Sequence, residues 1–287
     1  MKDYMLGLYE KSMPNTLSWA EKLLCAKECG FDYLEVSIDE TEEKLARLKM
    51  SKEERKYLID TMFICGVPIR TMCLSGHRKF SLGSEDDATR NRGMEIMKDA
   101  IELADDLGIR IIQLAGYDVY YDEGNERTKL LFEENLRKSV EYAAEKGVIL
   151  AFETMETEFM NTVEKAMEYV NKINSPYLQV YPDCGNLTNA AKTYDKSVVD
   201  DLEVGKGHIA ALHLKETVPG KFREIPFGTG HVDFIEAINV AWNLGVRKYT
   251  LEFWYVGNEN WKEVIKENRL FIEEKFKCVE NKNKYTA

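Results

Sequence analysis

The sequence predicts a single α/β domain built as an eight-stranded (β/α)₈ barrel of the TIM type. Three observations predict it: short apolar runs alternate with longer amphipathic runs, the alternation occurs eight times, and glycines recur between a helical run and the next apolar run. Strands that alternate with helices are typical of parallel βαβ units, and eight such units indicate a closed barrel. The length of 287 residues suits this fold, which usually takes roughly 200 to over 300 residues.

The predicted strands are short apolar runs, and each is followed by a run with helical periodicity. The strands are expected at residues 5–10, 33–37, 70–74, 111–114, 149–153, 178–181, 209–214 and 249–253. The helices are expected at residues 16–29, 51–65, 85–107, 128–146, 162–173, 196–204, 233–244 and 261–277.

Glycine marks the ends of several predicted helices. Gly30, Gly66, Gly108, Gly147 and Gly245 each follow a helical run and precede a strand. Glycine there suits the left-handed position that ends a helix. No linker rich in Ser, Gly or Pro interrupts the chain, so we expect one barrel domain over residues 1–280 and a frayed tail over 281–287.

Composition and charge exclude several classes of partner. The net charge of −11 disfavours nucleic acid and anionic membranes as partners. No apolar run is long enough for a membrane span, and the N-terminal residues do not resemble a signal peptide. The six cysteines form no CxxC pair, so we expect reduced thiols in a cytoplasmic protein.

Four possible metal ligands fall at the ends of consecutive predicted strands. Glu153, Asp183, His213 and Glu252 belong to strands 5, 6, 7 and 8, and the active site of a (β/α)₈ barrel lies at these carboxyl ends. Any one of them alone is more often an ordinary solvated or packed residue. Carboxylates gathered in a barrel mouth repel one another unless a cation compensates them. The set therefore predicts one divalent ion: Mn²⁺, Mg²⁺, Zn²⁺ or Co²⁺.

Several segments carry a resemblance to a known family. They are residues 6–11 (LGLYEK), 72–78 (MCLSGHR), 82–87 (LGSEDD), 113–121 (QLAGYDVYY) and 181–187 (YPDCGNL). Together they closely resemble the L-ribulose-5-phosphate 3-epimerases of L-ascorbate utilisation, also called L-xylulose-5-phosphate 3-epimerases, within the xylose-isomerase-like barrels. The resemblance covers nearly the whole chain and implies metal ligands at Glu153, Asp183, His213 and Glu252.

The resemblance also implies the reaction. Such an enzyme interconverts L-ribulose 5-phosphate and L-xylulose 5-phosphate by moving a proton at C3 through an enediolate. Inversion at C3 needs two acid/base groups on opposite faces of that carbon. We assign these roles to Glu153 and Glu252, while Asp183 and His213 act as ligands only.

The substrate phosphate needs cations or backbone N–H groups. The loop after strand 3 offers both, at Ser75, His77 and Arg78; an ordinary solvated basic loop is the alternative. Lys221 and Arg223 form a second candidate phosphate site. Two further residues complete the candidates for substrate binding: Lys215, and Glu156 where relatives often have Asp.

Other functions stay open at this point. An aldose–ketose isomerase of the hexulose-6-phosphate type, or an epimerase of another ketose, could use the same residues. A sugar-binding protein without activity is a further alternative. A DNA-repair endonuclease on this barrel is disfavoured, because it needs more than the four histidines present and a basic face. The oligomeric state is open, with a homodimer as one option.

Overall fold

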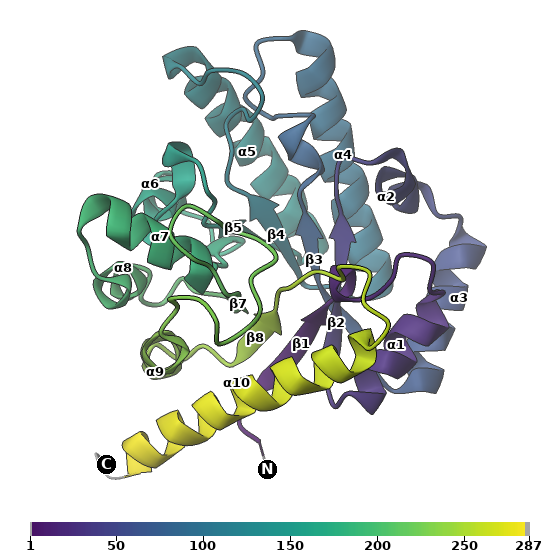
Figure 1. Ribbon diagram of the computed structural model, residues 1–287. Coiled ribbons are helices and arrows are strands. Elements are labelled where there is room, and N and C mark those ends of the chain that lie inside the picture. Colours follow the sequence, from purple (N-terminus) through teal and green to yellow (C-terminus); the bar gives the residue numbers. More distant parts are fainter. Residues whose placement is uncertain (1, 285–287) are drawn as a thin grey trace.

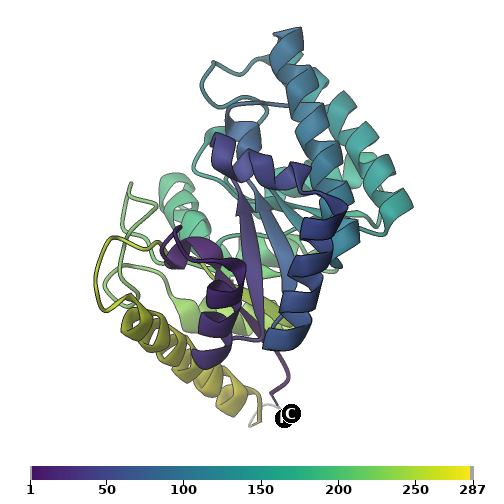
Figure 2. The same ribbon diagram turned by 90° about the vertical axis from the view of Figure 1, so that its right-hand side faces the viewer.

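The computed structural model describes residues 2–284 and arranges eight parallel strands inside a ring of helices (Figures 1 and 2). The strands are β1 (Met5–Tyr9), β2 (Tyr33–Ile38), β3 (Ile69–Leu74), β4 (Ile111–Ala115), β5 (Ile149–Glu153), β6 (Leu178–Val180), β7 (Leu212–Leu214) and β8 (Lys248–Leu251). Their order in the sheet is β6-β5-β4-β3-β2-β1-β8-β7. Isolated parallel bridges from Val180 to Ile209 and from Asp183 to His213 join β6 to the β7 edge, so the barrel closes. The predicted fold class is confirmed.

Helices cover the outside of the barrel (Figure 1). They are α1 (Trp19–Glu28), α2 (Glu42–Ala46), α3 (Lys52–Cys65), α4 (Asp87–Leu107), α5 (Glu126–Lys146), α6 (Val163–Ile173), α7 (Cys184–Tyr194), α8 (Val198–Val204), α9 (Phe234–Asn243) and α10 (Trp261–Lys284). The apolar faces of these helices pack against the strands, and strand residues such as Leu6, Leu34 and Ile112 are fully buried. Burying one such side chain stabilises the fold by roughly 1.5–3 kcal/mol.

Local signals at the helix ends explain much of the agreement with the sequence. Ser18, Ser51 and Asn125 each form a capping box at the start of a helix, which satisfies N–H groups that the helix itself leaves unpaired. The glycines expected after the helices all have positive φ, the backbone region that glycine adopts without a steric penalty.

The structure departs from the predicted elements at three main places. Helix α2 was not expected from the sequence. The helix expected at 196–204 is α8, but α7 precedes it and begins directly after β6 at Cys184. At the C-terminus, α10 runs to Lys284, so the first four residues of the expected tail are helical, and residues 285–287 lie outside the described part. Within residues 2–284, no helix combines the length and apolar character needed to cross a membrane.

Candidate active site

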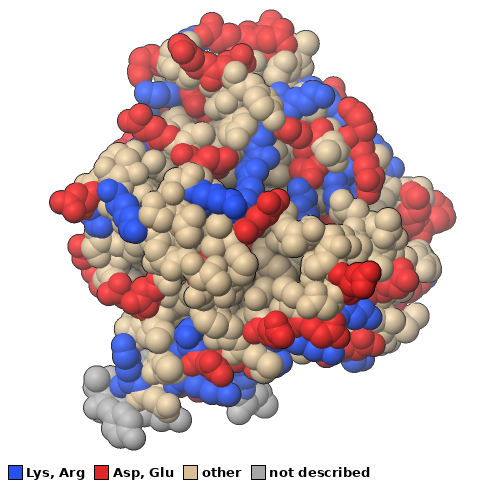
Figure 3. Space-filling view, in the orientation of Figure 1, with Lys and Arg blue, Asp and Glu red and all other residues tan. Residues whose placement is uncertain are grey.

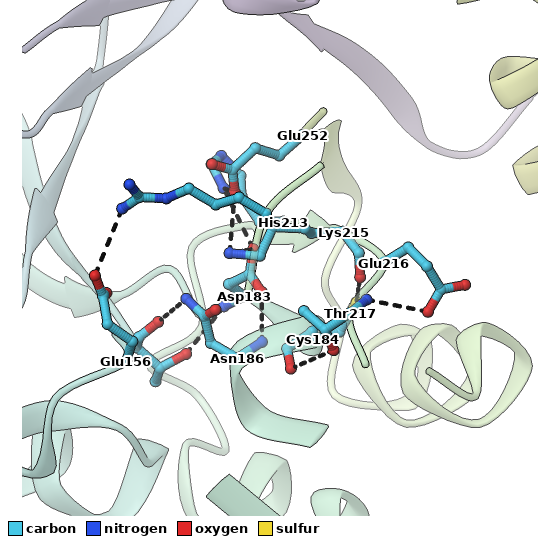
Figure 4. A network of polar contacts seen from close by, with 12 residues as sticks. Glu156, Asp183, Cys184, Asn186, His213, Lys215, Glu216, Thr217 and Glu252 are labelled. Atoms are coloured by element: carbon cyan, nitrogen blue, oxygen red, sulfur yellow. Dashed lines mark hydrogen bonds and ion pairs between the residues drawn. The ribbon is translucent and has the colours of Figure 1, made fainter. Parts of the chain in front are cut away.

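Four acidic and imidazole side chains converge at the carboxyl ends of β5 to β8. They are Glu153 at the end of β5, Asp183 after β6, His213 within β7 and Glu252 directly after β8. One potential ligand atom from each lies within 4.8 Å of the others, and all four side chains are buried. Figure 4 shows Asp183, His213 and Glu252 pointing toward one another. The structure thus brings together the four residues that the strand ends predicted, in a cluster that can hold one metal ion.

The position of Asp183 follows from the helix that starts beside it. Asp183 is the N-cap of α7, and its Oδ1 accepts a hydrogen bond of 2.7 Å from the backbone N–H of Asn186. Its own N–H donates to Thr154 Oγ1 on the neighbouring segment. The other oxygen, Oδ2, accepts no hydrogen bond within the described part of the chain and lies 3.1 Å from Lys215 Nζ. Its partner among the described residues is a cation, Lys215, so this oxygen is suited to binding positive charge.

A residue that the sequence analysis missed, Glu35 of β2, orients His213. Glu35 Oε1 lies 2.6 Å from His213 Nε2, and the second ring nitrogen, Nδ1, lies 2.9 Å from Glu252 Oε2. Glu35 Oε2 accepts hydrogen bonds from Thr71 Oγ1 and Tyr181 Oη. When the Nε2–H donates to Glu35, Nδ1 presents its lone pair to the cluster, as in many metal-binding histidines. The available signal is a glutamate between two apolar residues, Leu34 and Val36, of a predicted strand.

Electrostatics separates the carboxylates into two kinds. Burial, with repulsion from Glu252, raises the pKa of Glu153 to about 8. Burial raises the pKa of Asp183 to about 7, although Lys215 opposes the shift. Burial also acts to raise the pKa of Glu252, but Lys215 and His213 outweigh it and leave that pKa below its usual value. Carboxylates this close together resist being ionised at the same time, and a divalent cation would offset the repulsion between their charges.

A pocket opens above this cluster at the barrel mouth. It is lined by Tyr9, Lys11, Cys73, Ser75, Arg78, Glu153, Met155, Glu156, Asn186, Lys215, Phe222, Arg223, Glu252 and Trp254. In the space-filling view, Lys and Arg side chains lie together near the middle of this face among acidic ones (Figure 3). The polar lining and the cations suit a small anionic ligand.

The two candidate phosphate sites meet at this pocket. Arg78, from the loop after β3, lies over the rings of Tyr117 and Tyr120. Arg223, from the loop after β7, has its Nη2 3.5 Å from Glu156 Oε1. Tyr117 and Tyr120 donate hydrogen bonds to the same Glu156 carboxylate. Arg78 and Arg223 therefore flank one carboxylate from two different loops.

Not every expected binding residue reaches the pocket. Ser75 does, but His77 lies beneath the loop with its Nε2 3.0 Å from the Gly93 carbonyl oxygen. Burial lowers the pKa of His77 to about 4, so the side chain is neutral at physiological pH. Lys221 is exposed, and its backbone pairs with Val218 in a turn. Neither His77 nor Lys221 is among the residues that line the pocket.

Glu216 organises the loop that carries Arg223. Its carboxylate accepts hydrogen bonds from the backbone N–H groups of Thr217, Gly228 and Val232. The contacts hold both ends of the loop after β7 against the barrel (Figure 4 shows Glu216 beside Thr217).

Comparison with known proteins places the chain in a family. Residues 24–275 match the family model of the xylose isomerase-like TIM barrel. The chain is 46% identical over 260 residues to the L-ribulose-5-phosphate 3-epimerase UlaE of Salmonella heidelberg (strain SL476), which covers 90% of both chains. It is 47% identical over 254 residues to the UlaE protein of Escherichia coli O157:H7, which covers 88% of both.

Solved structures agree on the fold at much lower identity. An L-ribulose 3-epimerase superposes with a TM-score of 0.78 at 18% identity, covering 99% of this chain and 98% of that one. A D-allulose 3-epimerase from Methylomonas sp., in complex with D-allulose, gives a TM-score of 0.77 at 16% identity, covering 96% and 98%. The chain therefore belongs to the xylose isomerase-like TIM barrel family and, within it, to the group of the UlaE L-ribulose-5-phosphate 3-epimerases.

Proposed function

We propose that this protein is a carbohydrate epimerase that interconverts L-ribulose 5-phosphate and L-xylulose 5-phosphate by inversion at C3. One observation carries the proposal: Glu153 and Glu252, at the carboxyl ends of β5 and β8, line the same pocket beside Asp183 and His213. Two carboxylates from separate strands can address both faces of one carbon. The identity of 46–47% to epimerases named for this reaction supports the choice of substrate.

One divalent ion, Mn²⁺, Mg²⁺, Zn²⁺ or Co²⁺, is proposed to bind to Glu153, Asp183, His213 and Glu252. Their donor set of three carboxylates and one imidazole fits such ions. Asp183 Oδ2 also fits, because the group that lies against it is itself a cation, Lys215 Nζ at 3.1 Å. When bound, the ion would act as a Lewis acid that polarises the C2 carbonyl of the ketose.

The protein's own carboxylates would move the proton. One glutamate accepts the C3 proton as its electron pair enters the enediolate, and the other returns a proton to C3 from the opposite face. The pKa of Glu153 is about 8, whereas that of Glu252 is held below its usual value. In the metal-free protein the two carboxylates thus lie in different electrostatic environments, which suits different roles in proton transfer.

The phosphate is proposed to bind between Arg78 and Arg223. Both line the pocket, and Arg78 Nε is buried with no hydrogen-bond partner in residues 2–284. An unpaired buried donor is costly unless a ligand satisfies it, and a phosphate oxygen would do so. A cytoplasmic location and a homodimer stay predictions.

A reaction in D₂O tests the proposed function. Starting from L-ribulose 5-phosphate, NMR should find L-xylulose 5-phosphate with deuterium at C3 and none at C1. An aldose product with deuterium at C1 or C2 would instead indicate an aldose–ketose isomerase. In that case the roles of Glu153 and Glu252 on two faces of C3 would have to be given up.

A further inference from the structure

Lys215 is a buried cation that contacts the carboxylate cluster directly. Its side chain is 5% exposed, and its Nζ lies 3.1 Å from Asp183 Oδ2 and 3.7 Å from Glu252 Oε2. Figure 4 shows it between these two acids. A lysine amine that lies within 4 Å of two buried carboxylates is in an environment that favours its charged form.

The contacted oxygens are the ones that a metal ion would need. Asp183 Oδ1 already accepts from the Asn186 N–H, which leaves Oδ2 for a metal. Glu252 Oε2 is also the oxygen that lies nearest His213 Nδ1. An ammonium group and a divalent ion held by the same two carboxylates would repel each other in this buried site.

We propose that Lys215 has two roles. In the metal-free protein it takes the place of the metal as counter-ion of the carboxylate cluster. Once the metal is bound, it acts as a second electrophile toward the substrate. Lys215 also lines the pocket, alongside Glu153 and Glu252. The enediolate spreads negative charge over O2 and O3, and Lys215 stabilises the charge on O3 while keeping its proton. This role deepens the proposed function and rests on it.

A second buried lysine, Lys22, has a purely structural role and serves for comparison. Lys22 is also nearly inaccessible, and its Nζ lies 3.5 Å from Glu10 Oε1. Glu10 has two further cations, Lys44 and Arg47, and Lys22 is not among the pocket residues. Lys22→Met is therefore the matched control for Lys215→Met, since both remove a buried ammonium group.

The first test needs no catalysis. Calorimetry measures the binding of Mn²⁺ to four metal-free proteins: wild type, Lys215→Met, Lys215→Arg and Lys22→Met. Lys215→Met should bind Mn²⁺ at least about tenfold more tightly than wild type, because the repelling charge is gone; Lys215→Arg and Lys22→Met should not. The melting temperature of Lys215→Met should fall more in the metal-free state than with Mn²⁺. If Lys215→Met does not fold, Lys215→Gln takes its place.

The second test measures turnover. With saturating Mn²⁺, kcat of Lys215→Met should fall by at least about 10², and Lys22→Met should retain wild-type kcat. Unchanged or weaker Mn²⁺ binding by Lys215→Met would overturn the counter-ion role, and unchanged kcat would overturn the electrophile role. If wild type itself exchanges no C3 proton, the proposed function fails, whereas the titration still decides the role of Lys215 toward the metal.

Discussion

Glu35 Oε1 lies 2.6 Å from His213 Nε2, deep inside the barrel, and this contact decides which ring nitrogen faces the acidic cluster. Hydrogen bonds from Thr71 Oγ1 and Tyr181 Oη to its second oxygen hold the carboxylate in this orientation. A histidine held in this way presents Nδ1 to Glu252 and Asp183. The orientation of His213 on β7 thus depends on Glu35 of β2, although β1 and β8 lie between these two strands in the sheet.

Glu35→Gln should weaken metal binding by about 10- to 100-fold, the usual effect of removing a carboxylate behind a ligating histidine. The amide can donate to Nε2 and so favour the tautomer whose Nδ1–H points at the metal. Calorimetric titration with Mn²⁺ measures the effect. Glu216→Gln is the control, because Glu216 is a buried carboxylate that bonds backbone N–H groups and not His213. Equal affinities for wild type and Glu35→Gln would show that Glu35 serves packing only.

Removal of the metal should abolish turnover. Exhaustive chelation of the wild type should leave an inactive protein that regains activity on addition of Mn²⁺ or Co²⁺. His213→Ala should bind less metal than wild type, because it removes the only nitrogen donor from the four-residue cluster. Elemental analysis of both proteins after dialysis provides the comparison. Full activity after chelation would contradict a metal-dependent mechanism.

Glu153→Gln and Glu252→Gln should each reduce kcat by at least about 10², the scale expected for loss of a general acid or base. Each substitution keeps the shape of the side chain and removes its ability to take up a proton. Metal content has to be measured alongside, because both residues also belong to the cluster. Near-normal kcat in a metal-loaded variant would exclude that residue from proton transfer.

Arg78→Ala and Arg223→Ala should each raise KM for L-ribulose 5-phosphate by about tenfold or more, because a charged hydrogen bond contributes roughly 1.5–3 kcal/mol. Turnover of unphosphorylated L-ribulose should change little. Lys221→Ala is the control, since Lys221 lies on the same loop as Arg223 but outside the pocket lining. An equal increase of KM for the phosphorylated and the free sugar would place the phosphate elsewhere.

The sequence predicts most of the fold because the barrel repeats one simple pattern. Apolar runs that end in Glu153 and Glu252 also locate the cluster, since the carboxyl ends of parallel strands meet at one mouth. Helix α7 escaped prediction, because it begins at Cys184 and Gly185, which have low helix propensity, and depends on Asp183 as its cap.

The periodicity of the sequence does not predict in which direction a side chain within a loop points. His77 and Arg78 are neighbours, yet one turns toward Gly93 and the other lines the pocket. Glu35 was overlooked for a related reason: its partner His213 is 178 residues away, and only barrel closure brings the two together. Arg78 and Arg223 likewise line one pocket, although the sequence places them in two rival phosphate sites.

Metal binding should strengthen as pH rises to about 8. In the metal-free protein the pKa of Glu153 is about 8 and that of Asp183 about 7, and a ligand must lose its proton to bind a metal. The bound protons therefore compete with the metal below these values. Affinity should increase from about pH 5 to about pH 8 and then level off. Calorimetry in two buffers with different ionisation enthalpies should detect proton release on binding.

The same shifts predict how the metal-free protein responds to pH. The pKa values of both acids are raised above their ordinary values of 4.5 and 3.8, so between those values and about 8 the folded state holds protons that the unfolded state has released. The contribution of these two groups to the free energy of unfolding should therefore be greatest at low pH. It should decline as the pH rises toward about 8. Glu153→Gln, which cannot ionise, should reduce this decline and lower the number of protons released by the metal. Metal affinity that stays constant between about pH 5 and about pH 8 would contradict the raised pKa values of Glu153 and Asp183.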